Sequence, residues 1–148
     1  MKWLLAAIGK AKANSPESQM VAEYSKRLSG KFTLKEIESK VPNKPKEAEA
    51  LLVACAGYDK VIALDERGKD ISSRELALQL SKWQQQGTSS VAFIIGGADG
   101  LDESVRKRAD LTLAFGRATW PHMLVRAMIA EQIYRAQTIN DGHPYHRD

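Results

Sequence analysis

Short apolar runs alternate with longer amphipathic stretches along the 148 residues of the chain. The most continuous run extends from Val91 to Ile95, where consecutive apolar residues, mostly β-branched, predict a strand that is buried on both faces. Strands of this kind occupy the centre of parallel sheets. Runs of a similar type predict four further strands, at residues 2–8, 32–41, 60–64 and 111–115.

The stretches between these runs carry helix-start signals. Ser15 precedes Pro16, which places a capping side chain before a proline at the first helical position. Ser72 and Glu75 form a capping-box pattern. Helices are expected from residue 16 toward 30, after 45 up to 57, after 72, after 102 and from about 121 to 138. This alternation predicts a single α/β domain, residues 1–148, with a mainly parallel sheet and helices on both faces.

The last predicted helix is apolar on almost every side. Its apolar residues are Met123, Leu124, Val125, Ala127, Met128, Ile129, Ala130, Ile133 and Tyr134. A helix that is apolar all round should be buried all round, and an outer helix of so small a domain achieves this by packing against a second subunit. We therefore expect a homodimer built on this helix. The alternative is a helix that is buried within one subunit.

Positive charge is concentrated in the first part of the chain, whose formal net charge as a whole is +4. Residues 1–60 hold 11 Lys and Arg against 7 Asp and Glu, whereas residues 61–148 hold 11 against 11. The basic residues of the first part are almost all lysines. A lysine-rich surface suits sequence-independent contact with phosphates, although an ordinary solvated surface explains the charge equally well.

Several classes of protein are disfavoured by what the sequence lacks. A single cysteine, Cys55, excludes an internal disulfide, and its apolar neighbours favour core packing. No apolar run approaches the length of a membrane span and no leader pattern is present, so we expect a cytoplasmic protein without membrane contact. The motifs G-x-G-x-x-G, G-x-x-x-x-G-K-[ST] and G-x-S-x-G are absent, which disfavours dinucleotide-binding dehydrogenases, NTPases and α/β-hydrolases.

Three predicted loops follow three strands and carry the candidate binding residues. They are the charged turn after Leu64, the glycine-rich turn after Ile95 and the loop after Phe115. Because the carboxyl ends of parallel strands meet at one edge of a sheet, these loops should lie together. Their glycines permit a ligand to approach the backbone closely, so we expect a nucleotide-like cofactor there. The alternative is that the glycines only form tight strand-to-helix turns.

All three histidines lie near the carboxyl end. His122 begins the last predicted helix, whereas His143 and His146 share the final residues with Tyr145 and Arg147. So dense a set of titratable groups indicates either a frayed end or part of an active site. In an active site, imidazole, phenol and guanidinium groups could take part in proton transfer and in the stabilisation of an anion. A zinc site on the tail histidines lacks a third ligand, so no metal is expected.

Four segments together resemble a known family. They are LDERGK at residues 64–69, FIIGGADG at 93–100, TWPHMLVRAMIAEQIYRA at 119–136 and NDGHPYHRD at the end. In order and spacing they are similar to the RlmH family, bacterial methyltransferases of the SPOUT superfamily that methylate N3 of a pseudouridine in large-subunit ribosomal RNA. The resemblance spans the chain, but residues 10–50 match it only in general character.

The resemblance implies a carboxyl-terminal trefoil knot, over about residues 60–148, whose loops bind S-adenosylmethionine. The residues that it suggests for this cofactor are Leu64, Asp65, Gly96, Gly97, Gly100, Gly116, Arg117, Ala118, Thr119, Trp120 and Pro121. Our catalytic candidates are His122, His143, Tyr145, His146 and Arg147. The family also implies a homodimer that acts on 23S ribosomal RNA in the large subunit or the whole ribosome. Trp120 stands where relatives often carry a smaller aliphatic residue.

A function of a different class fits some of the same features. A ribosome-binding or RNA-binding protein without catalysis would use the same lysine-rich face. Tight, stoichiometric binding of S-adenosylmethionine separates the two hypotheses.

Overall fold

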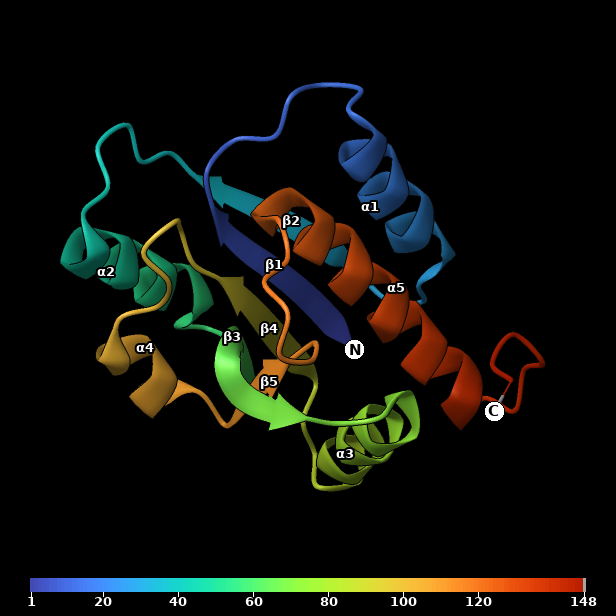
Figure 1. Ribbon diagram of the computed structural model, residues 1–148. Coiled ribbons are helices and arrows are strands. Elements are labelled where there is room, and N and C mark those ends of the chain that lie inside the picture. The colour runs from blue at the N-terminus through green and yellow to red at the C-terminus, as the bar shows by residue number, and fades with distance from the viewer. Residues whose placement is uncertain (148) are drawn as a thin grey trace.

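A five-stranded sheet forms the centre of the computed structural model, which describes residues 1–147 (Figure 1). The strands are β1 Lys2–Ile8, β2 Phe32–Ile37, β3 Lys60–Asp70, β4 Ser90–Ile95 and β5 Leu111–Ala114. They lie in the order β2-β1-β4-β3-β5, and every neighbouring pair is parallel. The predicted parallel α/β sheet is therefore confirmed.

Strand β4 is the central strand, as its sequence predicts. All six of its residues are buried, and it pairs with β1 on one side and β3 on the other. Phe93 lies between Leu5 and Ile62 in this register, and all three side chains are fully buried. The continuous apolar run of β4 thus reflects cover on both faces of the sheet.

Five helices cover the two faces of the sheet. They are α1 Pro16–Arg27, α2 Lys44–Cys55, α3 Ser73–Gln85, α4 Glu103–Arg108 and α5 His122–Asn140. Helices α3 and α5 pack on one face, with α1 against α5, while α2 and α4 cover the other face (Figure 1). The predicted caps are present, because Ser15 Oγ accepts a hydrogen bond from Ser18 N and both bonds of the Ser72–Glu75 capping box form. Cys55 is buried in the core, as expected.

Strand β3 differs from the prediction, which placed a charged turn directly after Leu64. The strand continues to Asp70, and its pairing with β5 shifts register between Leu64 and Lys69. Gly68 lies in the segment where the register shifts and passes close to β5. A Cβ there would lie 2.7 Å from the backbone of Thr112, so this close approach requires glycine. The turn prediction was wrong because pairing with a distant strand continues β3 beyond its apolar run.

Helix α5 is buried largely within one subunit. This corrects the expectation that its apolar residues are buried by a second subunit. Ala127, Ile129, Ala130, Ile133 and Ala136 are completely buried without any partner chain. Other apolar residues of the helix, among them Leu124 and Met128, remain only partly covered. Only this second set is available to a second subunit.

None of the helices within residues 1–147 combines the length and apolar character needed to cross a membrane.

Candidate active site

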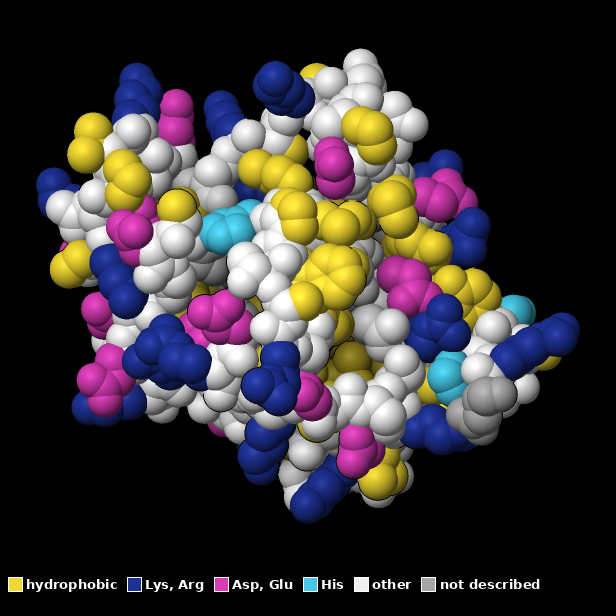
Figure 2. Space-filling view, in the orientation of Figure 1, with side chains coloured by type: hydrophobic (Ala, Val, Ile, Leu, Met, Phe, Trp, Pro, Cys, Tyr) yellow, Lys and Arg dark blue, Asp and Glu magenta, His cyan; other side chains and the backbone are white. Residues whose placement is uncertain are grey.

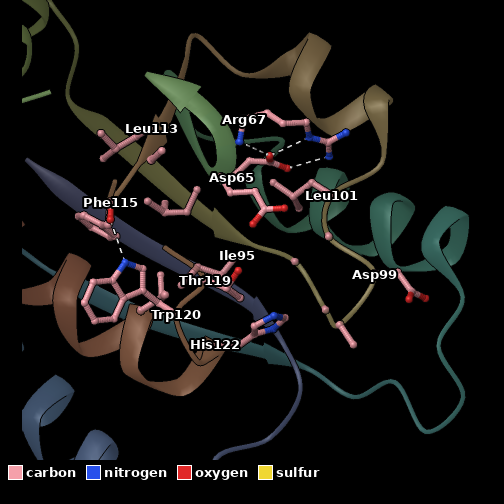
Figure 3. Close-up of a pocket in the computed structure, with 18 of the residues that line it drawn as sticks. Asp65, Arg67, Ile95, Asp99, Leu101, Leu113, Phe115, Thr119, Trp120 and His122 are labelled. Atoms are coloured by element: carbon pink, nitrogen blue, oxygen red, sulfur yellow. Dashed lines mark hydrogen bonds and ion pairs between the residues drawn. The ribbon is translucent and has the colours of Figure 1, made fainter. Parts of the chain in front are cut away.

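A cavity of about 510 Å³ lies at the carboxyl ends of β3, β4 and β5 (Figure 3). Residues of all three predicted loops contribute to it, although those that follow Leu64 lie within β3. The lining residues named in the sequence prediction are Leu64, Asp65, Gly96, Gly97, Gly100, Gly116, Ala118, Thr119, Trp120 and His122. The structure therefore brings together ten residues that lie up to 58 positions apart, as expected for the carboxyl edge of a parallel sheet.

The glycine-rich turn after β4 is shaped by packing within the protein. A Cβ on Gly97 would lie 2.8 Å from Oε1 of Glu47 and 3.2 Å from Cγ2 of Ile8, and neither of these residues lines the cavity. A Cβ on Gly96 would lie 2.9 Å from the backbone of Gly100. Both positions thus require glycine for reasons that do not involve a ligand, while the turn still presents its backbone to the cavity.

An acidic side chain forms one wall of the cavity at the end of the regular part of β3. The side chain of Asp65 is 4% exposed and accepts two hydrogen bonds from the Arg67 side chain, at 3.0 and 3.1 Å. Nη1 of Arg106 lies 4.0 Å from Oδ2 of the same carboxylate. Burial raises the pKa of the Asp65 carboxyl, but the bonds from Arg67 and the two positive charges outweigh burial and lower the pKa overall. The carboxylate is therefore ionised and held in one orientation.

The loop between β5 and α5 forms the opposite wall and is fixed at two points. Asp70 Oδ1 accepts a hydrogen bond from the backbone N–H of Gly116 at 3.1 Å, and the indole of Trp120 donates to the carbonyl of Phe115 at 2.8 Å (Figure 3). Gly116 has a φ of +84° and open space where a Cβ would be, so its conformation, and not its packing, requires glycine. Two predicted residues of this loop, Arg117 and Pro121, do not line the cavity.

His122 is the only one of the five catalytic candidates that lines this cavity. It is the first residue of α5, and Figure 3 shows its ring on the side of the cavity across from Asp65 and Arg67. Because Pro121 ends the loop and α5 begins at the next residue, His122 lies at the end of the helix that borders the cavity.

The other catalytic candidates lie at the far end of α5, within the described residues (Figure 1). The helix has 19 residues, and at 1.5 Å per residue it is about 28 Å long. A glycine, Gly142, with a φ of +71° ends the helix, and the following chain folds back on it. Within one chain the tail and the cavity are therefore separate.

The chain after α5, residues 141–147, is called the tail, and it packs against three side chains of that helix. Tyr145 donates a hydrogen bond to Glu131 at 2.9 Å and meets the ring of Tyr134 edge-on. Arg135 stacks over the Tyr145 ring and lies 3.1 Å from Nδ1 of His146. The tail is therefore packed against α5 as far as His146.

Tyr145 is held as a neutral phenol. Burial raises its pKa, and hydrogen bonds with Tyr24 and Glu131 raise it further. A phenol in this environment donates a hydrogen bond and does not act as a base near neutrality. His143 accepts a bond from the backbone N–H of Tyr145, while Arg147 is exposed to solvent.

Several lining residues were not predicted from the sequence, namely Lys44, Glu66, Arg67, Ile95, Ala98, Asp99, Leu101, Leu113, Ala114, Phe115 and Val125. Most of them extend the same three loops by one or two positions. Lys44 is different, because it comes from the start of α2 and gave no local signal.

The cavity fits a cofactor with an apolar ring system and a small charged part. Its volume lies in the usual range of small-molecule sites, about 300–1,000 Å³. Leucine, isoleucine, phenylalanine and tryptophan side chains stand beside the backbone of the two glycine-containing turns. Three carboxylates, Asp65, Glu66 and Asp99, line the cavity against the two cations Lys44 and Arg67, so the lining suits a cationic group more than a phosphate. Among residues 1–147 no group of His, Cys, Asp and Glu is arranged to hold a metal ion.

Comparison with known proteins agrees with this geometry. A family model described as a predicted SPOUT methyltransferase matches residues 1–146. Proteins named ribosomal RNA large subunit methyltransferase H, from Paramagnetospirillum magneticum and Rhodospirillum centenum, are 53% and 51% identical, and each comparison covers 99% of both chains.

Solved structures show the same fold at low sequence identity. A probable methylase family protein from Haemophilus influenzae has a TM-score of 0.63 at 12% identity, covering 99% of this chain and 70% of the other. A probable methyltransferase from Bordetella pertussis has a TM-score of 0.59 at 11% identity, covering 90% and 95%. With its parallel sheet, its cavity between three strand-end loops and a family match over nearly its whole length, the chain belongs to the SPOUT methyltransferase family.

Proposed function

We propose that this protein transfers a methyl group from S-adenosylmethionine to N3 of a pseudouridine in bacterial 23S ribosomal RNA. The observation that carries the proposal is the cavity at the ends of β3, β4 and β5, in a chain 53% identical to a relative that is named as a large-subunit ribosomal RNA methyltransferase. The resemblance of the four sequence segments to the RlmH family supports N3 of a pseudouridine as the atom that is methylated.

The residues of the cavity bind and orient the cofactor. When bound, S-adenosylmethionine supplies an electrophilic methyl group on a sulfonium. The backbone of Gly97, Gly116 and residues 118–120 would hold the cofactor between apolar side chains, and the Asp65 carboxylate is fixed in the wall by Arg67. Such fixed contacts align the reacting groups without reorganisation during the reaction.

The imide N3 of the base must also lose its proton, because the neutral imide is a poor nucleophile. An imidazole of the tail, His143 or His146, accepts this proton, and the Arg147 guanidinium stabilises the anion that develops. Tyr145 is excluded as the base by its raised pKa, and its bond to Glu131 and its contact with Arg135 make it a residue that positions the tail. His122 reaches the base from the cavity side.

These groups form one active site only if two chains combine. In a single chain the cavity and the tail lie at opposite ends of α5. We infer a homodimer in which the tail of one subunit completes the cavity of its partner. An antiparallel arrangement of the two α5 helices would place each tail beside the partner's His122.

The surface of the protein supports such a dimer. Figure 2 shows hydrophobic side chains gathered over α1 and the amino-terminal half of α5. Met20 and Trp120 are 42% and 40% exposed, and Leu124 and Met128 are half-buried. Contiguous apolar surface of this kind marks interaction sites, and cyclic dimers are the commonest assemblies.

The same proposal includes a single domain with a trefoil knot in residues 60–148, a cytoplasmic location, and the large subunit or the whole ribosome as the partner. The SPOUT family and the resemblance of the sequence motifs support these points.

The decisive experiment measures transfer of a labelled methyl group to three substrates. Free 23S rRNA, large subunits and whole ribosomes are taken from cells that lack this protein, so that the target base is unmodified. We expect one labelled pseudouridine per 23S rRNA in at least one substrate. Stoichiometric S-adenosylmethionine binding without label in any of them would contradict the proposed reaction, and absence of cofactor binding would favour an RNA-binding protein without catalysis.

A further inference from the structure

Two loops beside the cavity carry an excess of lysines. The loop from β1 to α1 holds Lys10 and Lys12, and the loop from β2 into α2 holds Lys40, Lys44 and Lys46. Residues 10–14 and 38–46 together contain these five lysines and one acidic residue, Glu38. We call the five lysines the lysine rim. Both loops emerge at the same edge of the sheet as the cavity, because β1 and β2 are parallel to β4 (Figure 1).

The first of these loops is held at its base by a buried ion pair. Glu36 Oε2 accepts a hydrogen bond from the backbone N–H of Ala11 at 2.7 Å and from Arg126 Nη1 at 2.6 Å. The Arg126 side chain is 3% exposed and also donates to the carbonyls of Ile8 and Gly9. Lys10 and Lys12 therefore extend from a backbone that is fixed on both sides of Ala11.

The second loop is held by another acidic residue. Glu47 is 7% exposed, and its Oε2 accepts hydrogen bonds from Ser39 Oγ at 2.8 Å and from the backbone N–H of Asn43 at 3.2 Å. These bonds close the loop between β2 and α2, so that Lys40 is carried on a short, tied segment. A rigid support lowers the entropic cost of ordering side chains on a ligand.

Lys10 and Lys44 of the lysine rim interact with Glu36 and Asp102 only at distances longer than an ion pair. Within residues 1–147, none of its five members forms a salt bridge at 4.0 Å or less. All are exposed except Lys44, which is half-buried and lines the cavity. In Figure 2, Lys and Arg side chains stand along the edge formed by these two loops. The rim thus joins the cavity to a surface on which five lysines stand against one acidic residue of the same loops.

Stability of the fold does not explain these positions. Lys44 and Lys46 lie in the first turn of α2, where the helix dipole favours acidic side chains. Val41, at the tip of the same loop, is 77% exposed. An exposed apolar side chain among lysines adds contact with a sugar or a base to the contacts with phosphates.

We propose that the lysine rim binds backbone phosphates of the ribosomal RNA next to the target base and so positions that base at the cavity. This inference rests on the proposed function, because it assigns the RNA-binding surface of that same site. The contacts are electrostatic and independent of sequence, whereas the tail and the cavity recognise the base itself.

The test compares two variants of equal charge. Lys10→Gln/Lys12→Gln/Lys40→Gln removes three exposed lysines of the rim and leaves Lys44 intact. Lys26→Gln/Lys31→Gln/Lys82→Gln removes three exposed lysines outside these loops. Methyl transfer to the best substrate is measured at several salt concentrations, and S-adenosylmethionine binding is measured by calorimetry.

We expect the rim variant to raise the KM for the RNA substrate by on the order of 10- to 100-fold at 0.15 M salt. The slope of log KM against log salt concentration should fall by about 2, because each lost phosphate contact removes roughly 0.7–0.9. The kcat and the cofactor affinity should stay near those of the unmodified protein. The control variant should change none of these values appreciably.

Equal effects of the two variants on KM and on the salt slope would overturn the proposal. So would a rim variant that loses affinity for ribosomes but not for free 23S rRNA, since that result would assign the rim to an acidic ribosomal protein. Failure of the proposed function is recognised separately, because the unmodified protein would then transfer no methyl group to any substrate.

Discussion

The carboxylate of Glu47 fills the space that a side chain on Gly97 would occupy, with Oε1 only 2.8 Å from the position of that Cβ. Glu47 lies in the first turn of α2 and is bonded to Ser39 in the loop that carries Lys40. Its contact with Gly97 therefore joins this loop to the turn after β4 that borders the cavity. The residue type at position 97 is thus set by a buried acid from a distant helix.

Replacement of Gly97 by alanine should destabilise the protein through this contact. Crowding of a packed site costs about 1–3 kcal/mol, and Glu47→Ala should relieve it, giving a coupling of roughly 0.5–3 kcal/mol in a double-mutant cycle of thermal or urea unfolding. Gly57→Ala is the control, because nothing lies within 4 Å of its Cβ. Additive effects of Gly97→Ala and Glu47→Ala would show that the two residues do not compete for space.

The stability of the protein should depend on pH through Asp65. Its pKa in the folded chain is lowered, so folding favours the ionised carboxylate relative to the unfolded chain, where the pKa is about 3.9. This contribution is complete above about pH 4 and is lost as the pH falls through the folded value. Thermal unfolding should therefore show Asp65→Asn to be less stable than the unmodified protein at pH 7, with a smaller difference at pH 3. A constant difference would argue against the ion pair with Arg67.

The tail should act on the partner's cavity. Truncation after Asn140 should leave S-adenosylmethionine binding nearly intact and remove methyl transfer, and Arg147→Ala should lower turnover far more than cofactor affinity. A Gly116→Val chain should lose cofactor binding, because valine is strained at a φ of +84°. Mixing this chain with the truncated chain should restore part of the activity, whereas each chain alone is the control. Activity of the mixture no greater than the sum of the two would reject action across the interface.

The proposed dimer predicts which residues of α5 matter for assembly. Met128→Asp should yield a folded monomer, because this side chain is only half-buried in one subunit. Leu78→Asp is the matched control, since Leu78 is 69% exposed on α3 and lies outside the proposed interface. Sedimentation velocity measures whether each variant is a monomer or a dimer, and circular dichroism shows whether it is folded. Ile129 is unsuitable for this test, because it is completely buried in the core and its replacement by aspartate would unfold the chain.

Local patterns predicted the elements of this fold well. The apolar run of β4, the caps at Ser15 and Ser72, and the strand-end loops all depend on neighbouring residues or on the shared direction of parallel strands. Together with the family resemblance, these features named ten of the residues that line the cavity.

Features that depend on distant residues were not predictable in this way. Glu36 and Arg126 are 90 positions apart, and Gly116 and Asp70 are 46 apart. Neither pair leaves a local signal, because hydrogen-bond partners are chosen by the folded topology. The extension of β3 past Leu64 has the same cause, since its later residues pair with β5.

The bond between Glu36 and the backbone N–H of Ala11 has a consequence for how a nucleic acid would be recognised. The carboxylate is itself held in place by the buried Arg126, so this loop cannot swing outward without breaking its bond to a fixed acceptor. A surface built on such a loop behaves as a fixed template. The ribosomal RNA would have to adapt its own shape to the protein, and segments whose backbone already matches that template would be selected over those that must be bent to fit it.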